Sequence, residues 1–184
     1  IYNLNEIENS RLVIKNNNGL VFLSNFFSNN FEKCHFFSLV RSPYSLYEGH
    51  RRRNLTTGIK DFAVFYNKII EKFIHDKNNL PNYNVLKFED LISNPKEIIN
   101  CLYKQADLEM ISRFRFKAKK LMDDNGNYST KFTFNKHHWF DLDNLNQILN
   151  PNVNNNQDKF LHNDEKKLLN ELTRDCLSKL NIEY

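Results

Sequence analysis

The chain has 184 residues, of which 40% are hydrophobic and 14% aromatic, so it can form one domain with a core and is too apolar for a disordered protein. The net charge of +4 suits an anionic ligand but does not by itself indicate a nucleic-acid-binding protein. Three widely spaced cysteines without a CxxC pair favour a reducing, cytoplasmic location, and no apolar run reaches the length of a membrane span.

The first half of the chain alternates between strand and helix patterns. His35–Val40 (HFFSLV) is almost uniformly apolar, which is typical of a strand covered on both faces. Ser42 and Pro43 are suited to the N-cap and first turn of a following helix. The remaining predicted elements are a strand at Arg11–Lys15, a helix within Gly19–Asn30 and an amphipathic helix at Ile59–Ile74.

The second half predicts one further strand, three helices and two polar loops. After the strand Asn84–Phe88, Asn94 and Pro95 are typical of a helix start, and this helix is expected to run to about Lys104. The other predictions are a helix at Leu108–Leu121, a mobile loop in DDNGNYSTK, a polar loop at Pro151–Asp158 and a terminal helix capped by Asn163.

This order of elements predicts the fold class. Strands alternate with helices, and no hairpin signal separates them, which favours an α/β fold with parallel strands. We expect a single domain over residues 1–184, with a three-layer, mostly parallel sheet flanked by helices.

Arg41 is the first residue after the apolar strand and precedes the expected helix N-terminus. Ligands of open parallel sheets bind beyond the carboxyl ends of the strands. A helix N-terminus and a guanidinium together suit phosphate or sulfate. Two interpretations stay open: Arg41 holds an anionic ligand, or it pairs with a surface carboxylate.

Three stretches in order resemble sulfotransferases that use 3′-phosphoadenosine 5′-phosphosulfate (PAPS). FFSLVRSPYSLYEG is similar to the segment that binds the 3′-phosphate, and VLKFEDLISNPKEIINCLYK to a later strand and helix signature. RLVIKNNNGLVFLSNFFSNNFEKCHFF resembles the region that leads into the arginine in bacterial members, and Trp139 before a final helix also fits. The resemblance covers nearly the whole chain and implies a nucleotide-kinase-like, P-loop-like fold.

The resemblance also implies roles for individual residues. Arg41 falls where the family binds the 3′-phosphate, and Phe88 where a tyrosine contacts the adenine. Glu89, with the adjacent Asp90, belongs to the signature, and we interpret both as structural, in turn and helix-start hydrogen bonding. Lys131 or Lys136 approximates the family's late basic phosphate-binding segment.

The sequence departs from the family at three points. Gly49 stands where a serine binds the nucleotide, so only its backbone could serve. Asn17 stands where cytosolic members carry a catalytic histidine, and an amide cannot act as a general base. No Gly-rich loop with a lysine precedes Arg11, and the chain does not start with Met. We therefore expect a C-terminal fragment that lacks the N-terminal strand and the loop for the 5′-phosphosulfate, and that is inactive alone.

The predicted function is sulfuryl transfer from PAPS to an acceptor hydroxyl or amine, without a metal. The catalytic residues, the acceptor and the oligomeric state are not predicted. The alternatives are a sulfotransferase-like domain that binds without catalysis and a nucleotide-dependent, kinase-like phosphotransferase.

Three further features are interpreted as structural. Arg51, Arg52 and Arg53 point about 100° apart on a helix and are interpreted as a solvated face, with Arg52 able to pair with Glu48. The alternative is that one of them attracts an anionic acceptor or the nucleotide. His137 and His138 are adjacent and lack further ligands at metal-binding spacing. His50 is interpreted as a surface histidine, with a catalytic role beside Gly49 as the alternative. We expect no metal, no nucleic acid and no membrane span, and a small molecule or glycan as acceptor.

Overall fold

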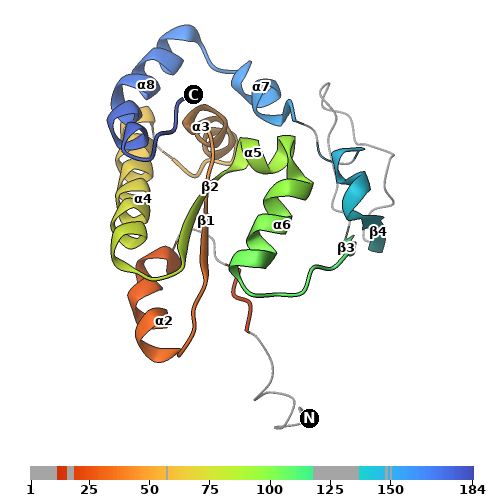
Figure 1. The fold of residues 1–184 in the computed structure, drawn as a ribbon. Helices are drawn as coiled ribbons and strands as arrows, with labels where there is room; N and C mark the ends of the chain where they lie inside the picture. The colour runs from red at the N-terminus through yellow and green to blue at the C-terminus, as the bar shows by residue number, and fades with distance from the viewer. Residues whose placement is uncertain (1–11, 16–18, 57, 118–136, 148, 150) are drawn as a thin grey trace.

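A computed structural model describes residues 12–15, 19–56, 58–117, 137–147, 149 and 151–184. Two small sheets and the helices around them make up this part of the chain (Figure 1). The elements, in order, are η1 (Leu20–Leu23), α2 (Ser24–Asn30), β1 (Phe36–Val40), α3 (Pro43–Arg52), α4 (Ile59–Asn79), β2 (Tyr83–Lys87), α5 (Phe88–Ser93), α6 (Pro95–Gln105), β3 (Arg113–Lys117), β4 (His137–Asp141), η2 (Leu142–Gln147), α7 (Val153–Asp158) and α8 (Asn163–Ser178).

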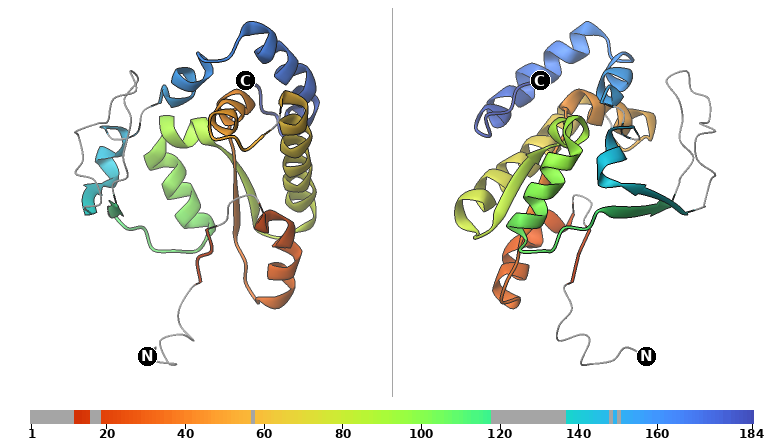
Figure 2. Two further views of the ribbon diagram at one scale, coloured as in Figure 1. Left: turned by 180° about the vertical axis from the view of Figure 1, so that it is seen from behind. Right: turned by 45° about the vertical axis from the view of Figure 1, so that its right-hand side comes forward.

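The β1 and β2 strands form a parallel pair at the centre of the molecule. Phe36 pairs with Tyr83 and Val40 pairs with Lys87, so both strands end at the same edge. A helical crossover through α3 and α4 joins them, as the alternating pattern predicted. In two views α4 lies on one side of this pair and α6 on the other (Figures 1 and 2).

The mixed α/β class is confirmed, but the sheets are smaller than expected. Leu12 and Val13 belong to the predicted strand Arg11–Lys15, yet the described residues 12–15 form no strand, and these two side chains are 72% and 85% exposed. The prediction that β1 is covered on both faces is also wrong. Phe37 and Leu39 are exposed on one face, while Phe36, Ser38 and Val40 on the other are half-buried or buried.

The core joins α4 to α8. The prediction of an amphipathic helix at Ile59–Ile74 is confirmed, and the helix continues to Asn79. Its apolar face packs against α8, where Leu169 is fully buried. The principal buried members of the core are Val40, Tyr47, Phe62, Tyr66, Ile70, Phe73, Tyr83, Leu161, Leu169, Cys176 and Leu177.

Helix starts follow the sequence in part. Pro95 begins α6 as predicted, but Asn94 makes no side-chain cap hydrogen bond. Asn163 is the first residue of α8 rather than its cap, because His162 forms a capping box with Glu165. The helix predicted within Gly19–Asn30 is split into η1 and α2.

Two predictions in the second half are wrong. Leu108–Leu121 was expected to be a helix, but residues 113–117 form β3, because RFRFK alternates with the period of a strand and pairs antiparallel with β4. No hairpin signal in the sequence predicted this pair. It lies on the other side of α6 from β1 and β2 (Figure 2). Pro151–Asp158 was expected to be a loop, but Val153–Asp158 forms α7. The predicted loop DDNGNYSTK lies outside the described residues.

None of the helices in the described part of the chain is long and apolar enough to cross a membrane.

A buried ionic network attaches α2 to α4. Asp76 is fully buried and accepts hydrogen bonds from Ser24 Oγ at 2.6 Å and from Lys72 Nζ. Lys72 Nζ also donates to Ser24 Oγ at 2.8 Å. His75 Nδ1 lies 3.2 Å from the same carboxylate. Because a buried charge is costly unless it is paired, the Asp76 carboxylate depends on its hydrogen bonds with Ser24 and Lys72.

Replacing Asp76 by Ala is therefore expected to lower the free energy of unfolding by about 3 kcal/mol, since Lys72 keeps a charge that has lost its partner. Urea denaturation followed by circular dichroism measures the change. Asp143→Ala is the matched control, because Asp143 also pairs with a lysine, Lys96, but both side chains are more than half exposed. The control should cost less than about 1 kcal/mol. An equal loss in the two variants would contradict the assigned role of burial.

Candidate functional site

Arg41 and Phe88 meet at the carboxyl edge of the parallel strands. Arg41 follows Val40, the last residue of β1, and Phe88 follows Lys87, the last residue of β2. Because Val40 and Lys87 are paired, the next residues leave the sheet side by side. The guanidinium carbon of Arg41 lies 4.7 Å from the centroid of the Phe88 ring, a cation–π contact. Two residues expected at one site, 47 positions apart in sequence, are thus brought together.

Arg41 is held on both its side chain and its backbone. Its Nε donates to Asn154 Oδ1 at 2.8 Å, and its carbonyl oxygen accepts a hydrogen bond from the Tyr66 hydroxyl at 3.0 Å. Burial lowers the pKa of Arg41, while the nearby carboxylates of Glu89 and Asp158 act in the opposite direction. The guanidinium is therefore half-buried and fixed in position.

Glu89 is the hub of the network around Arg41. Its Oε1 accepts hydrogen bonds from the Ser42 backbone N–H at 3.2 Å and from Asn154 Nδ2, and its Oε2 accepts one from the Tyr184 hydroxyl at 3.0 Å. Burial, and then the charge of Glu89, raise the pKa of the Tyr184 hydroxyl. The expected structural role of Glu89 in helix-start hydrogen bonding is confirmed.

The Glu89 carboxylate lies at the N-terminus of α3, where the sequence predicted an external anion. Ser42 occupies the predicted N-cap position, but its side chain makes no cap hydrogen bond. Its Oγ is buried and has no hydrogen-bond partner among the described residues. A carboxylate at this position satisfies a backbone N–H and interacts favourably with the helix dipole. Glu89, from another helix, thus accepts the N–H of the N-cap residue, as the acidic residue of a capping box does.

The α7 helix supplies two residues that the sequence interpretation missed. Asn154 bridges Arg41 and Glu89, and Asp158 Oδ1 accepts a hydrogen bond from the buried Ser45 Oγ at 2.6 Å. Burial raises the pKa of Asp158, and the hydrogen bond from Ser45 opposes this shift. Asn154 belongs to an Asn-rich run that reads as compositional bias, so no sequence signal distinguished it from its neighbours.

The structure describes only one of the two remaining predicted nucleotide-binding residues. Gly49 is buried within α3, and its carbonyl oxygen accepts a hydrogen bond from Arg53 Nε at 2.9 Å. The Arg53 Nη2 atom lies 3.6 Å from the position that a Cβ of Gly49 would take. Lys131, like Lys136 and Asn17, lies outside the described residues.

The arginines after Gly49 point in different directions, as their spacing predicted. Arg52 lies 3.6 Å from Glu48, the predicted pair. Arg51 instead reaches Glu165 at 2.8 Å. His50 is half-buried rather than on the surface as expected. Its ring packs edge-on against Phe62, and burial lowers its pKa.

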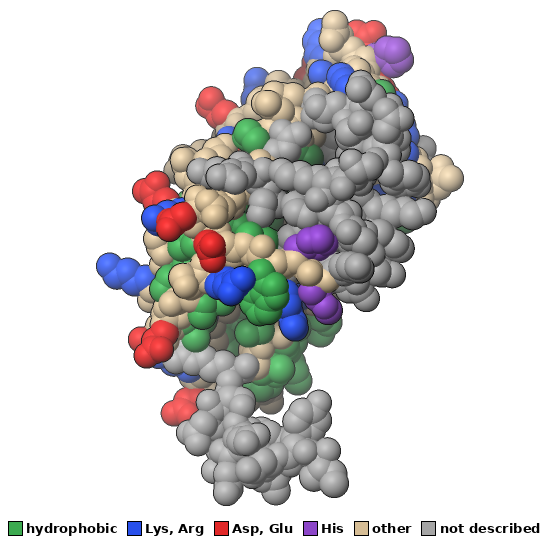
Figure 3. All heavy atoms as spheres, turned by 90° about the vertical axis from the view of Figure 1, so that its right-hand side faces the viewer, with side chains coloured by type: hydrophobic (Ala, Val, Ile, Leu, Met, Phe, Trp, Pro, Cys, Tyr) green, Lys and Arg blue, Asp and Glu red, His purple; other side chains and the backbone are tan. Residues whose placement is uncertain are grey.

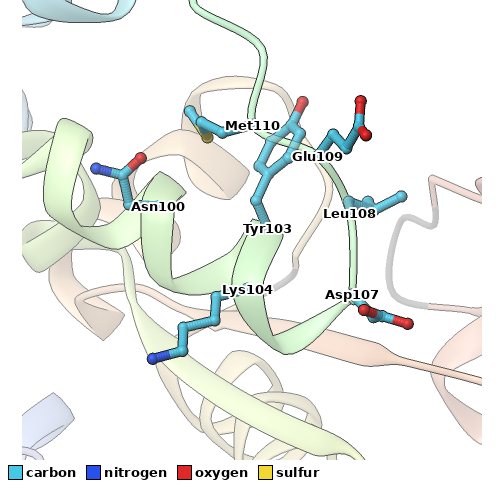
Figure 4. A pocket seen from close by; sticks show the side chains of 7 residues that line it. All are labelled: Asn100, Tyr103, Lys104, Asp107, Leu108, Glu109 and Met110. Atoms are coloured by element: carbon cyan, nitrogen blue, oxygen red, sulfur yellow. The ribbon is translucent and has the colours of Figure 1, made fainter.

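Two open cavities lie away from this network, beside α6 and the segment that follows it. The first, of about 420 Å³, is shown in Figure 4. The second, of about 670 Å³, extends from Lys96 to Asn144 and shares Met110 with the first. The linings of both combine charges of opposite sign with apolar side chains. Within the described ranges, no three His, Cys, Asp or Glu side chains are grouped to hold a metal ion.

The comparisons with known proteins add no relative to this picture: no family model, curated protein or solved structure matches the chain.

Replacing Glu89 by Gln is expected to lower the free energy of unfolding by about 2 kcal/mol, because the three donors then face a neutral group that accepts more weakly. Thermal and urea denaturation measure the loss. Glu97→Gln is the control, since Glu97 is also in the first turn of a helix but is exposed. If the two variants were equally stable, Glu89 would not be the hub described above.

Proposed function

We propose that the chain takes part in sulfuryl transfer from PAPS and that Arg41 and Phe88 bind the adenosine 3′-phosphate end of this nucleotide. The observation that carries the proposal is their contact at the carboxyl edge of β1 and β2. This edge is where ligands bind in parallel α/β sheets. On this proposal the α/β part belongs to a three-layer, nucleotide-kinase-like fold of a cytoplasmic enzyme.

The chemistry of the two side chains supports a nucleotide. A guanidinium presents its N–H donors in a planar fork that matches the oxygens of a phosphate. An aromatic ring beside it suits the flat face of a base. The half-burial of both residues limits the competition from water, so each contact is stronger than on an open surface.

The reaction proposed is an in-line displacement at sulfur. An acceptor oxygen or nitrogen forms a bond to the sulfur while the bond between the sulfur and the phosphate oxygen breaks. Adenosine 3′,5′-bisphosphate leaves with the electron pair, and the acceptor proton passes to a base that the described residues do not identify. Arg41 would anchor the leaving nucleotide at its 3′-phosphate and would not act on the sulfur.

A second candidate is a domain that binds an anion without catalysis. The observation in its favour is that Glu89 accepts the backbone N–H of Ser42, the N-cap residue of α3, while the Gly49 carbonyl accepts a hydrogen bond from Arg53. Both groups would otherwise be open to a nucleotide. A thermal-shift panel separates the candidates: a nucleotide enzyme is stabilised by adenosine 3′,5′-bisphosphate without metal, and the binding domain is not.

Arg41→Ala is expected to weaken the binding of adenosine 3′,5′-bisphosphate about ten-fold or more, because one charge-assisted contact is lost. Isothermal titration calorimetry measures the dissociation constant. Arg52→Ala removes an equal charge from the C-terminal end of α3, at a position paired with Glu48, and should leave the affinity unchanged. Unchanged affinity in the Arg41 variant would refute its role.

Phe88→Tyr is expected to bind the nucleotide more tightly than Phe88→Leu, because only the tyrosine keeps a ring that can stack on adenine and on the guanidinium of Arg41. The same titration compares the two variants. Equal dissociation constants would count against stacking as the source of affinity.

A further inference from the structure

The β3–β4 pair has one apolar face and one cationic, aromatic face. The strands are antiparallel, with Phe114 opposite Phe140 and Arg115 opposite Trp139. Phe114 and Phe140 stack with their ring centroids 6.2 Å apart and are half-buried. Because side chains alternate along a strand, Arg113 and Arg115 both lie on the opposite face, together with Trp139.

On the face that carries Arg113 and Arg115, the outer face, the exposed indole of Trp139 lies close to both guanidiniums. Trp139 is 56% exposed, and the guanidinium carbons of Arg113 and Arg115 lie 5.3 Å and 5.5 Å from its ring centroid. His137 is exposed on the same face. Figure 3 shows this side of the molecule, where Lys and Arg side chains gather beside a hydrophobic one and the histidines.

The part of the chain that the structure describes does not neutralise the two guanidiniums. Among the described residues, neither Arg113 nor Arg115 makes an ion pair, although Asp141 is opposite Arg113 in the register. Stacking on an indole holds the guanidinium plane and leaves its N–H edges directed away from the ring. Successive side chains on one strand face repeat about every 6.7 Å. The surface thus presents two ordered, unpaired forks at a fixed spacing.

We propose that the outer face of β3 and β4, formed by Arg113, Arg115 and Trp139, binds an acidic polysaccharide. The forks match carboxylate or sulfate groups on neighbouring sugar units, and the exposed part of the indole provides an apolar contact for a sugar ring. The complementary charge, unpaired within the described part of the protein, favours a polyanion over a neutral partner.

The contacts favour a polysaccharide over a single-stranded nucleic acid. Nucleic-acid-binding surfaces of this kind stack bases on exposed rings. Here two guanidiniums lie over the indole, so less of the ring is left for the full stacking contact of a base, whereas a sugar ring can use the exposed part alone. Oxyanions on sugars need only the N–H edges. This inference rests on β3 and β4 and does not depend on the proposed sulfuryl transfer.

The single tryptophan of the chain makes the surface directly observable, because all tryptophan emission comes from Trp139. Titrating the full chain with oligogalacturonate at moderate salt is expected to change this emission in a saturable way that high salt reverses. Replacing both Arg113 and Arg115 by Ala should weaken binding about ten-fold. Replacing both by Lys keeps the charge but loses the planar forks, and should give an intermediate affinity.

The matched control is the Lys60→Ala, Lys77→Ala double variant, which removes two exposed charges from α4 and should bind like the unmodified chain. Each variant is checked by its thermal unfolding. If the control lost as much affinity for oligogalacturonate as the Arg113 and Arg115 variant, net charge alone would explain the binding, and the proposal would be overturned. If oligothymidylate bound more tightly than oligogalacturonate and quenched the emission, the ligand of this surface would be a nucleic acid and not a polysaccharide. No saturable response to oligogalacturonate would exclude the surface as a polysaccharide site.

Discussion

The Glu89 carboxylate is the interaction on which the arrangement of the candidate site depends. It accepts hydrogen bonds from the start of α3, from α7 and from Tyr184, and it lies close to the Arg41 guanidinium. A half-buried carboxylate needs such donors, because the free energy lost on leaving water is otherwise not recovered. Through these bonds Glu89 links the turn after β1 to α7 and Tyr184, and Asn154, which bonds both Glu89 and Arg41, holds the guanidinium in place. The position of Arg41 over Phe88 is therefore a result of the charge next to it.

The network also constrains how an anion could bind. A phosphate at the α3 N-terminus would meet the Glu89 carboxylate, which already accepts the backbone N–H of the N-cap residue Ser42. A ligand at Arg41 must approach from the Phe88 side, where the guanidinium stacks on the ring, and avoid Glu89. Such a constraint favours a ligand with a flat group beside its charge over a small inorganic ion, since only the former gains from both side chains.

The sequence predicted those parts of the fold that follow from local periodicity. The apolar run before Arg41, the amphipathic pattern after Gly58 and Pro95 at a first helical position each led to the correct element, because burial and backbone restraint act there over short distances. Leu108 and Ile111 precede RFRFK at a spacing that is typical of a helix. This spacing led to the prediction of a helix in place of the strand. Asn154 and Tyr184 could not be predicted as site residues, since their roles come from long-range packing of α7 and the chain end on Glu89.

The Arg41–Asn154 hydrogen bond joins residues 113 positions apart, and the Asn154–Glu89 bond joins residues 65 apart. Contacts with such large sequence separation carry a high entropic cost of loop closure and usually form after the transition state of folding. Weakening them should accelerate unfolding and leave the folding rate nearly unchanged. The hydrogen bonds at the carboxyl ends of β1 and β2 would then determine the unfolding rate, and so the lifetime of the native state, more than the folding rate.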